Sequence, residues 1–433
     1  MNNYSYRRNN NNNNNYEMKS YKSFRRRLSG SFMCMVMGGI LFFCAPALLF
    51  WNEGRAVYQA KTLKEARSKA VTVPTFASWN NGKLIHVTGF AKPAKGTSVL
   101  LESDLPTSVS NLINTELNKV QNVVDDDPAA SAPDASNSKP AIVLKREVEY
   151  YEWKESKKET SRKTAGGGEE TTTTYSYSKG WTSSHIDSSR FHETRHSNFQ
   201  PKYNDKMKWT SGTVELYDQY DNDKSLGFKL DKFLLETAGN GNMKPVDMNP
   251  ITWRPGQDDL ITSSSGYNEI GDHRFTWEIT KPHVVSLIGE QQGDGTIRAW
   301  RSNYGVEFHK LVSGTKTYDE IISIAEGENT MMTWLIRAGG IFLWYVSFTS
   351  MAQPLGVIAD LGTIPCIGLE PGTILNYITG IAAFLLALLL SLIVIAFAWF
   401  WYRPLYSCSL IVGALVTTYF LNQNVNKKKK RNN

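Results

Sequence analysis

Long apolar stretches near both ends of the chain flank a polar middle that covers 52–332. From Leu28 to Trp51 there are 24 residues without a charge, and about 20 apolar residues are enough to cross a bilayer. Three more apolar stretches cover 333–352, 374–400 and 405–421, the last one near the lower limit of length for a span. The pattern predicts an integral membrane protein with four transmembrane helices and a large domain between the first two.

The first apolar stretch follows Arg25, Arg26 and Arg27, as the apolar core of a signal peptide does. It is long for such a core, however, and it ends at Trp51 and Asn52 rather than at small residues that a signal peptidase cleaves. We therefore expect a retained first span rather than a removed leader.

Charge is concentrated in the tails. The net charge is +7, but the tail up to Leu28 has seven Lys/Arg and one Glu, and the tail after Leu421 has five Lys/Arg and no acid. The tails thus hold +11 and the remaining chain sums to −4, which argues against nucleic-acid binding by the middle. Basic residues flanking spans stay on the cytoplasmic side. Four spans put both tails on that side, so we expect both termini in the cytosol or nucleoplasm and the middle domain in the lumen.

These patterns divide the chain into segments of distinct expected structure. We expect a disordered, basic and Asn-rich cytosolic tail at 1–28, spans at 29–51, 333–352, 374–400 and 405–421, a lumenal domain at 52–332 with a flexible loop at 125–141, a cytosolic or re-entrant loop at 353–373, and a basic cytosolic tail at 422–433.

The middle domain carries β signals after a first helical segment, Ala56 to Ala70. Ile142–Lys157 and Thr171–Trp181 have the composition of strands, and Gly166–Gly168 lies between them, so they predict a long hairpin. Further short strand patterns are separated by Gly and Pro. We predict an α+β domain dominated by antiparallel strands.

The sequence His192-Glu193-Thr194-Arg195-His196 matches the H-E-x-x-H pattern of zinc proteases. Two histidines four apart on a helix can bind zinc, and the glutamate can act as a base. Ser, Arg and Asn surround the match, so no apolar helix face supports it, and a solvated loop is the simpler interpretation. We expect no metal, no cofactor and no catalytic residue, and keep a zinc-dependent hydrolase at His192, Glu193 and His196 as an alternative.

Asn52-Glu53-Gly54-Arg55 lies where the first span leaves the bilayer. This membrane-junction motif predicts either a charged collar that holds the domain to the membrane or a partner, or simple interfacial anchoring with a turn at Gly54. A glutamate there can also pair with a cation on another span. We expect Arg337, near the edge of the second span, to reach toward the headgroups.

Tyr402-Arg403-Pro404-Leu405 joins the third and fourth predicted spans. Aromatic residues next to it form an interfacial belt, and Pro404 favours a tight turn. We call this the span-edge motif.

The chain ends with Lys430 and Arg431 at the positions where a dilysine retrieval signal has two lysines. The pair predicts either retrieval to the endoplasmic reticulum or only the basic flank that topology and anionic lipids favour. Gly38, Gly39, Gly339 and Gly340 are small residues at which helices can approach closely, so we expect the spans to carry self-association.

Five further sequence segments stand in an order that is typical of one family: 48–56, 83–89, 144–153, 334–340 and 402–405. Together they resemble the transmembrane protein 43 (LUMA) family. The resemblance implies a four-span protein of the endoplasmic reticulum and inner nuclear membrane that self-associates and associates with emerin and lamins. The Asn-rich tail and the loop at 125–141 depart from the family pattern.

We therefore expect a non-catalytic membrane protein that organises or scaffolds membrane protein complexes and nuclear-envelope structure, with membrane lipids and further copies of itself as partners. A channel or channel-modulating subunit is the main alternative, because oligomers of multi-span proteins can enclose a pore. The spans contain no interior Asp, Glu, Lys or His, which argues against a pump or coupled transporter.

Overall fold

The fold comes from a computed structural model of the full chain. It describes residues 5–8, 15–94, 141–201, 203, 206–210, 212–241, 243–245, 251–254, 261–262, 268–364, 370–405 and 407–408.

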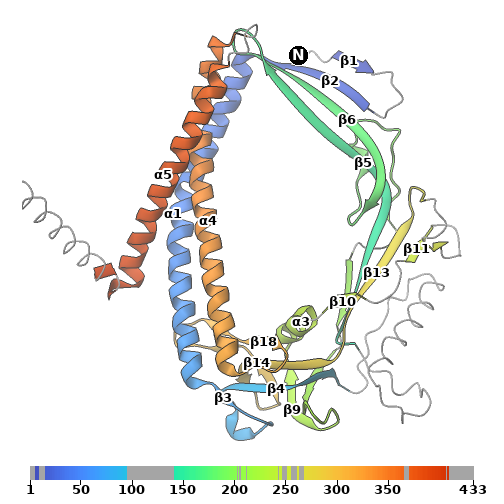
Figure 1. The fold of residues 1–433 in the computed structure, drawn as a ribbon, viewed down its shortest axis with the longest axis vertical. Helices are drawn as coiled ribbons and strands as arrows, with labels where there is room; N and C mark the ends of the chain where they lie inside the picture. The colour runs from blue at the N-terminus through green and yellow to red at the C-terminus, as the bar shows by residue number, and fades with distance from the viewer. Residues whose placement is uncertain are drawn as a thin grey trace, which may run out of the picture.

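Three long helices form one side of the molecule (Figure 1). They are α1 (Phe24–Lys69), α4 (Tyr318–Ala359) and α5 (Pro371–Tyr402). Each is long and apolar enough to cross a membrane. They contain the first three predicted spans. Of the predicted fourth span, 405–421, only Leu405, Ser407 and Cys408 are among the described residues. Of the predicted loop 125–141 only Ala141 is described, and the predicted tail 422–433 lies outside the described residues.

The helices pack against one another through a small apolar core. Ala45 and Leu49 of α1, Trp344 of α4 and Ala387 of α5 are buried together in it. One interpretation of the junction motif predicted a turn at Gly54, and this is wrong, because α1 continues as one helix of 46 residues through the motif and through most of the predicted helix at 56–70. Likewise α4 begins fifteen residues before the predicted span, at a capping box between Thr317 and Glu320.

A seven-stranded sheet lies at one end of α1 and α4. Its strands are β3 (Val71–Thr72), β4 (Leu84–Pro93), β8 (Val214–Tyr217), β9 (Ser225–Leu230), β14 (His283–Gln291), β15 (Thr296–Arg298) and β18 (Lys310–Ser313). The pairings run β4–β8–β9–β15–β14 and return from β14 to β4, so this part of the sheet closes on itself. Its alternating apolar residues form the main core together with helix α3 (Lys232–Gly241).

The closed sheet is fixed to the helices by a second apolar cluster. Leu63 of α1 and Ile321 and Ile322 of α4 are buried against Leu84 of β4 and Ile288 of β14. The domain therefore continues directly from the ends of the two helices.

A nine-stranded sheet forms the other side of the molecule. It contains β1 (Ser5–Arg8), β2 (Asn15–Lys22), β5 (Val143–Lys163), β6 (Glu169–Thr182), β7 (Lys206–Thr210), β10 (Lys244–Pro245), β11 (Ile251–Trp253), β12 (Ile261–Thr262) and β13 (His273–Thr280). A short pair, β16 (Trp300–Arg301) and β17 (Glu307–Phe308), completes the strands that the structure describes.

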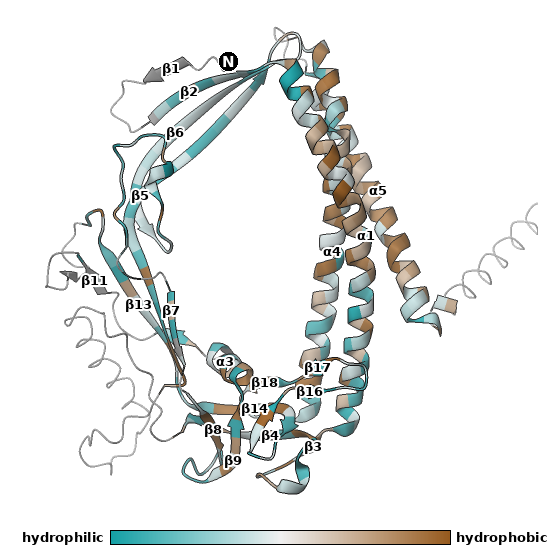
Figure 2. Cartoon of the chain, turned by 180° about the vertical axis from the view of Figure 1, so that it is seen from behind, coloured by the Kyte–Doolittle hydropathy of each residue, from teal (hydrophilic) through white to brown (hydrophobic). Residues whose placement is uncertain are grey.

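The hairpin predicted around Gly166–Gly168 is confirmed, since β5 and β6 pair antiparallel from Tyr150↔Thr182 to Lys163↔Glu169. Gly166 and Gly167 have φ of 76° and 75° and form its tip. We call β5, β6 and β2 together the arch, because Figures 1 and 2 show them bowing away from the helices and returning to the opposite end.

Two expectations differ from the structure here. The tail to residue 28 is not wholly disordered, because β2 pairs with β6 from Asn15↔Ser176 to Lys22↔Glu169 and satisfies its backbone groups there. The middle region is also not confined to one end of the helices, because the hairpin tip contacts the start of α1.

Candidate functional site

The junction motif lies inside the helix bundle rather than at its surface. Asn52 and Glu53 are 0% and 1% exposed, and Gly54 is buried as well. Because α1 stays helical there, successive residues of the motif face α4 and α5 in turn. A buried carboxylate is stable only with partners that compensate its charge.

Glu53 receives three hydrogen bonds from two other helices. The Nε–H and Nη2–H groups of Arg337 on α4 donate to its two carboxylate oxygens, at 2.7 and 2.8 Å. Trp399 on α5 donates its indole N–H to one of these oxygens at 2.8 Å. The Arg337 guanidinium also lies over the ring of Trp334, 4.7 Å from its centroid. This two-pronged ion pair neutralises both buried charges and ties α1, α4 and α5 together.

A second set of polar contacts joins α1 to α4 one turn away. Asn52 donates to the backbone oxygen of Thr333 at 3.1 Å. Arg55 donates to the side chains of Asn329 and Thr333 at 3.1 and 3.0 Å. Asn329 in turn donates to the backbone oxygen of Ala56 at 3.1 Å. We call Asn52, Glu53, Arg55, Asn329, Thr333, Arg337 and Trp399 the junction clamp.

The span-edge motif meets the junction motif at Gly54. A Cβ at this position would lie 2.7 Å from Cζ of Tyr402, so only glycine allows α5 to approach α1 this closely. The Tyr402 ring also packs beside Phe50, with ring centroids 5.2 Å apart. Arg403, just after the end of α5, lies 5.8 Å from the Trp399 ring centroid. Pro404 and Leu405 follow, and Leu405 is exposed.

The junction motif contains only the α1 side of the junction clamp, and its partners on α4 and α5 lie in distant parts of the sequence. We expected Arg337 to reach toward headgroups, whereas it points to Glu53, and we did not single out Trp399 at all. The usable signal was charge: a glutamate at the edge of one span favours a cation at the matching depth of another, and Arg337 is the only charged residue within the second predicted span.

The H-E-x-x-H match does not lie on a helix. His192 stacks on Tyr175, with centroids 4.3 Å apart, whereas His196 stacks on Tyr177, also at 4.3 Å. The Glu193 backbone N–H donates a hydrogen bond to the Tyr177 hydroxyl oxygen at 3.0 Å. Each histidine thus packs on its own tyrosine of β6, and the described part of the chain holds no group of three metal-ligating side chains.

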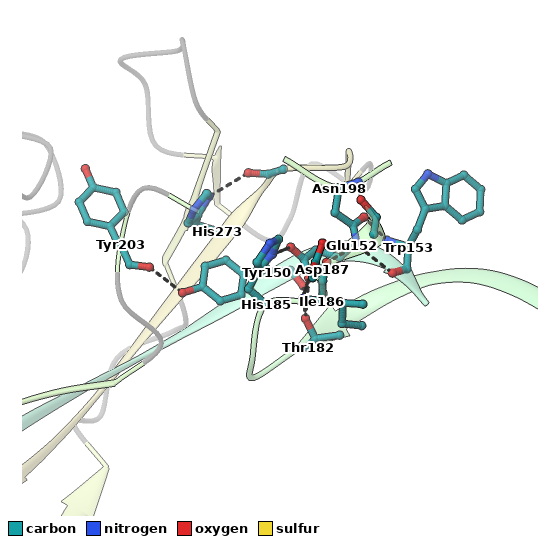
Figure 3. Close-up of polar contacts among 12 residues, drawn as sticks. Tyr150, Glu152, Trp153, Thr182, His185, Ile186, Asp187, Asn198, Tyr203 and His273 are labelled. Atoms are coloured by element: carbon teal, nitrogen blue, oxygen red, sulfur yellow. Dashed lines mark hydrogen bonds and ion pairs between the residues drawn. The ribbon is translucent and has the colours of Figure 1, made fainter. Parts of the chain in front are cut away.

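A buried carboxylate, Glu152, organises the segment that follows β6 (Figure 3). His185 and the backbone N–H of Ile186 lie 2.5 and 2.9 Å from its two oxygens. Asn198 holds the same segment to β5 by hydrogen bonds with both backbone groups of Trp153, at 2.8 and 3.0 Å. These contacts hold the loop after β6 against the arch. We therefore interpret Glu152, His185 and Asn198 as residues that stabilise the fold.

Comparison with known proteins gives one consistent name. The sequence profile of transmembrane protein 43 matches residues 150–404. Transmembrane protein 43 from Homo sapiens is 27% identical over 95% of this chain and 94% of its own length, and the Pongo abelii protein gives the same values. The homologue from Drosophila melanogaster is 22% identical over 89% of this chain and 93% of its own. No solved structure matches the chain.

Proposed function

The chain belongs to the transmembrane protein 43 family, and from this membership and the junction clamp we propose that it is a non-catalytic scaffold that organises protein complexes in the endoplasmic reticulum and inner nuclear membrane. Its multi-pass membrane character agrees with the three apolar helices. The proposal assigns the arch and the closed sheet to holding partners and the helices to placing them in the membrane.

The observation that carries the proposal is that the two buried charges of the junction clamp, Glu53 and Arg337, are paired with each other. Glu53 and Arg337 are 1% and 13% exposed and bind each other through two hydrogen bonds. Groups that work in catalysis or transport must exchange protons or ligands, whereas a saturated ion pair resists exchange. Such a pair favours a rigid element that transmits the position of the domain to the membrane helices.

The proposed partners are membrane lipids, further copies of the chain and nuclear-envelope proteins such as emerin and lamins. The last group rests on the family resemblance alone. Both termini are proposed to face the cytosol or nucleoplasm, because both tails are basic. Lys430 and Arg431 lie outside the described residues, and for them both alternatives stay predictions: a retrieval signal, or a basic flank that contacts anionic lipids.

Proximity labelling tests the proposal. A biotin ligase fused to the N-terminus of the endogenous chain should label membrane proteins of the endoplasmic reticulum and nuclear envelope in a reproducible set. A free ligase anchored by one unrelated span, matched in abundance, is the control. Equal labelling by both fusions would contradict a scaffold role, and a location outside these membranes would contradict the proposed site of action.

A further inference from the structure

The tip of the arch is fastened to the ends of two membrane helices. Arg27 of α1 donates one hydrogen bond to the backbone oxygen of Gly167, at 2.6 Å, and one to Asp360 beyond α4, also at 2.6 Å. Its Nε lies 3.3 Å from a carboxylate oxygen of Glu169. The side chains of Arg27 and Asp360 are 8% and 3% exposed, so the contact is a buried, charged one. It lies at the opposite end of α1 from the closed sheet (Figure 1).

The arch therefore runs the full length of the helices. At its other end, Val143 of β5 is buried in the main core with β4, beside the end of α1. The 46 residues of α1 extend roughly 69 Å as a helix, and the 21 residues of β5 extend roughly 69 Å as a strand. The apolar part of α1, Leu28 to Trp51, and the outer half of β5 thus lie at the same depth.

The outer half of the arch is too polar for lipid. In residues 152–163 of β5, eight of the twelve side chains are charged, and the paired part of β6, 169–180, has no Leu, Ile, Val, Phe or Met. Lys157 and Glu159 are each 52% exposed. Pairing of β5 with β13 ends at Tyr150, and the Asn198 side chain bonds the backbone of Trp153 on the same edge. From Lys154 to Lys163 no described strand pairs with that edge of β5. Lipid tolerates neither exposed charges nor open sheet edges.

The outer surface of the helices is apolar, in contrast to that of the arch, and is suited to lipid. Leu385, Leu389 and Leu392 of α5 are 60%, 55% and 60% exposed, and Figure 2 shows the apolar colour along the helices and the polar colour along the arch. A single chain surrounded by lipid on all sides cannot satisfy both surfaces at one depth. Several copies can, if each turns its helices outward and its arch inward.

We propose that copies of this chain assemble in the membrane around a shared water-filled interior, with α1, α4 and α5 toward lipid and the arches inside. The inference deepens the proposed self-association and rests on it. It also places the hairpin tip and β2 on the side of the membrane where the N-terminal tail lies, since both contact the start of α1.

Cysteine chemistry tests the position of the arch. In a full-length chain with Cys34, Cys44, Cys366 and Cys408 changed to Ala, Lys19→Cys and Thr172→Cys occupy directly paired positions of β2 and β6. Oxidation of intact membranes should form a disulfide within one chain. Lys19→Cys with Glu215→Cys, on the closed sheet, is the control pair. Failure of the first pair to cross-link would overturn the arch, because tail and hairpin would then lie in different compartments.

Solvent access tests the interior. Single cysteines at Lys157 and Glu159 should react with a small charged thiol reagent on the order of tenfold faster than single cysteines at Leu385 and Leu389, because only hydrated thiols ionise readily. The mass of the wild-type protein in lipid nanodiscs is measured alongside. An oligomer with fast arch reaction supports the proposal. If the protein is an oligomer but the cysteines of the arch do not react, the proposed water-filled interior is contradicted and self-association is not. If the protein is a monomer, both the water-filled interior and the proposed self-association are contradicted.

Discussion

Gly54 of α1 and Tyr402 of α5 pack so closely that a Cβ on the glycine would lie 2.7 Å from the tyrosine ring. This contact brings together two motifs that are almost 350 residues apart in the sequence. The contact sets the distance between the first and third membrane helices at the level of the junction clamp.

Gly54→Ala should therefore destabilise the protein by about 1–3 kcal/mol, because the Tyr402 ring must move out of its place. Thermal unfolding in detergent measures the effect. Gly39→Ala on the same helix is the matched control, since a Cβ there meets nothing within 4 Å. Adding Tyr402→Ala to Gly54→Ala should restore part of the loss. An unchanged unfolding temperature in Gly54→Ala would contradict the close contact between Gly54 and Tyr402.

Removing one partner of the Glu53–Arg337 pair should cost about 3–5 kcal/mol, because the other charge stays buried without compensation. Glu53→Leu tests this, and Glu53→Leu with Arg337→Met should recover much of the loss. Glu326→Leu provides the control on α4, since its pair with Arg67 is exposed and should contribute less than about 1 kcal/mol. Equal effects of the two glutamate variants would refute the clamp.

The four glycines of the spans should separate into two classes. Gly38 and Gly340 face Ser347 and Leu49 within the chain, whereas Gly39 and Gly339 have open space beside them. We expect Gly340→Ile to lower the unfolding temperature, and Gly39→Ile with Gly339→Ile to weaken the oligomer while the fold remains. Size measurement in nanodiscs and thermal unfolding distinguish the two. An unchanged oligomer in the second variant would place self-association elsewhere.

His86 should make stability depend on pH. Burial lowers the pKa of His86, partly offset by its hydrogen bond to the Lys316 backbone oxygen at 2.9 Å. The unfolded chain then binds a proton more readily than the folded one, so stability is complete above the unfolded pKa, about 6.5, and falls as pH drops below it. The unfolding temperature measured from pH 7.5 to 5 should fall less steeply in His86→Gln than in the wild type. Parallel curves would contradict this assignment.

The parts that composition and periodicity determine could be predicted from the sequence. Apolar length gave the three helices, and the glycines with flanking strand residues gave the β5–β6 hairpin. The partners of Glu53 in the junction clamp could not be predicted from the sequence. Arg337 and Trp399 are 284 and 346 residues away from it, and no local pattern encodes their contact. The pairing of β2 was missed for a related reason: the neighbouring Asn run indicates disorder, and the partner strand that orders β2 is distant in sequence.

The central claim is that the clamp holds the membrane helices in the geometry that the scaffold role requires. The most direct measurement compares proximity labelling by the wild-type chain and by Arg337→Leu, with a ligase at the N-terminus and with matched abundance and location. We predict that the variant loses most labelling of nuclear-envelope and reticulum membrane proteins, while Glu326→Leu keeps it. An unchanged labelled set in Arg337→Leu would contradict the claim.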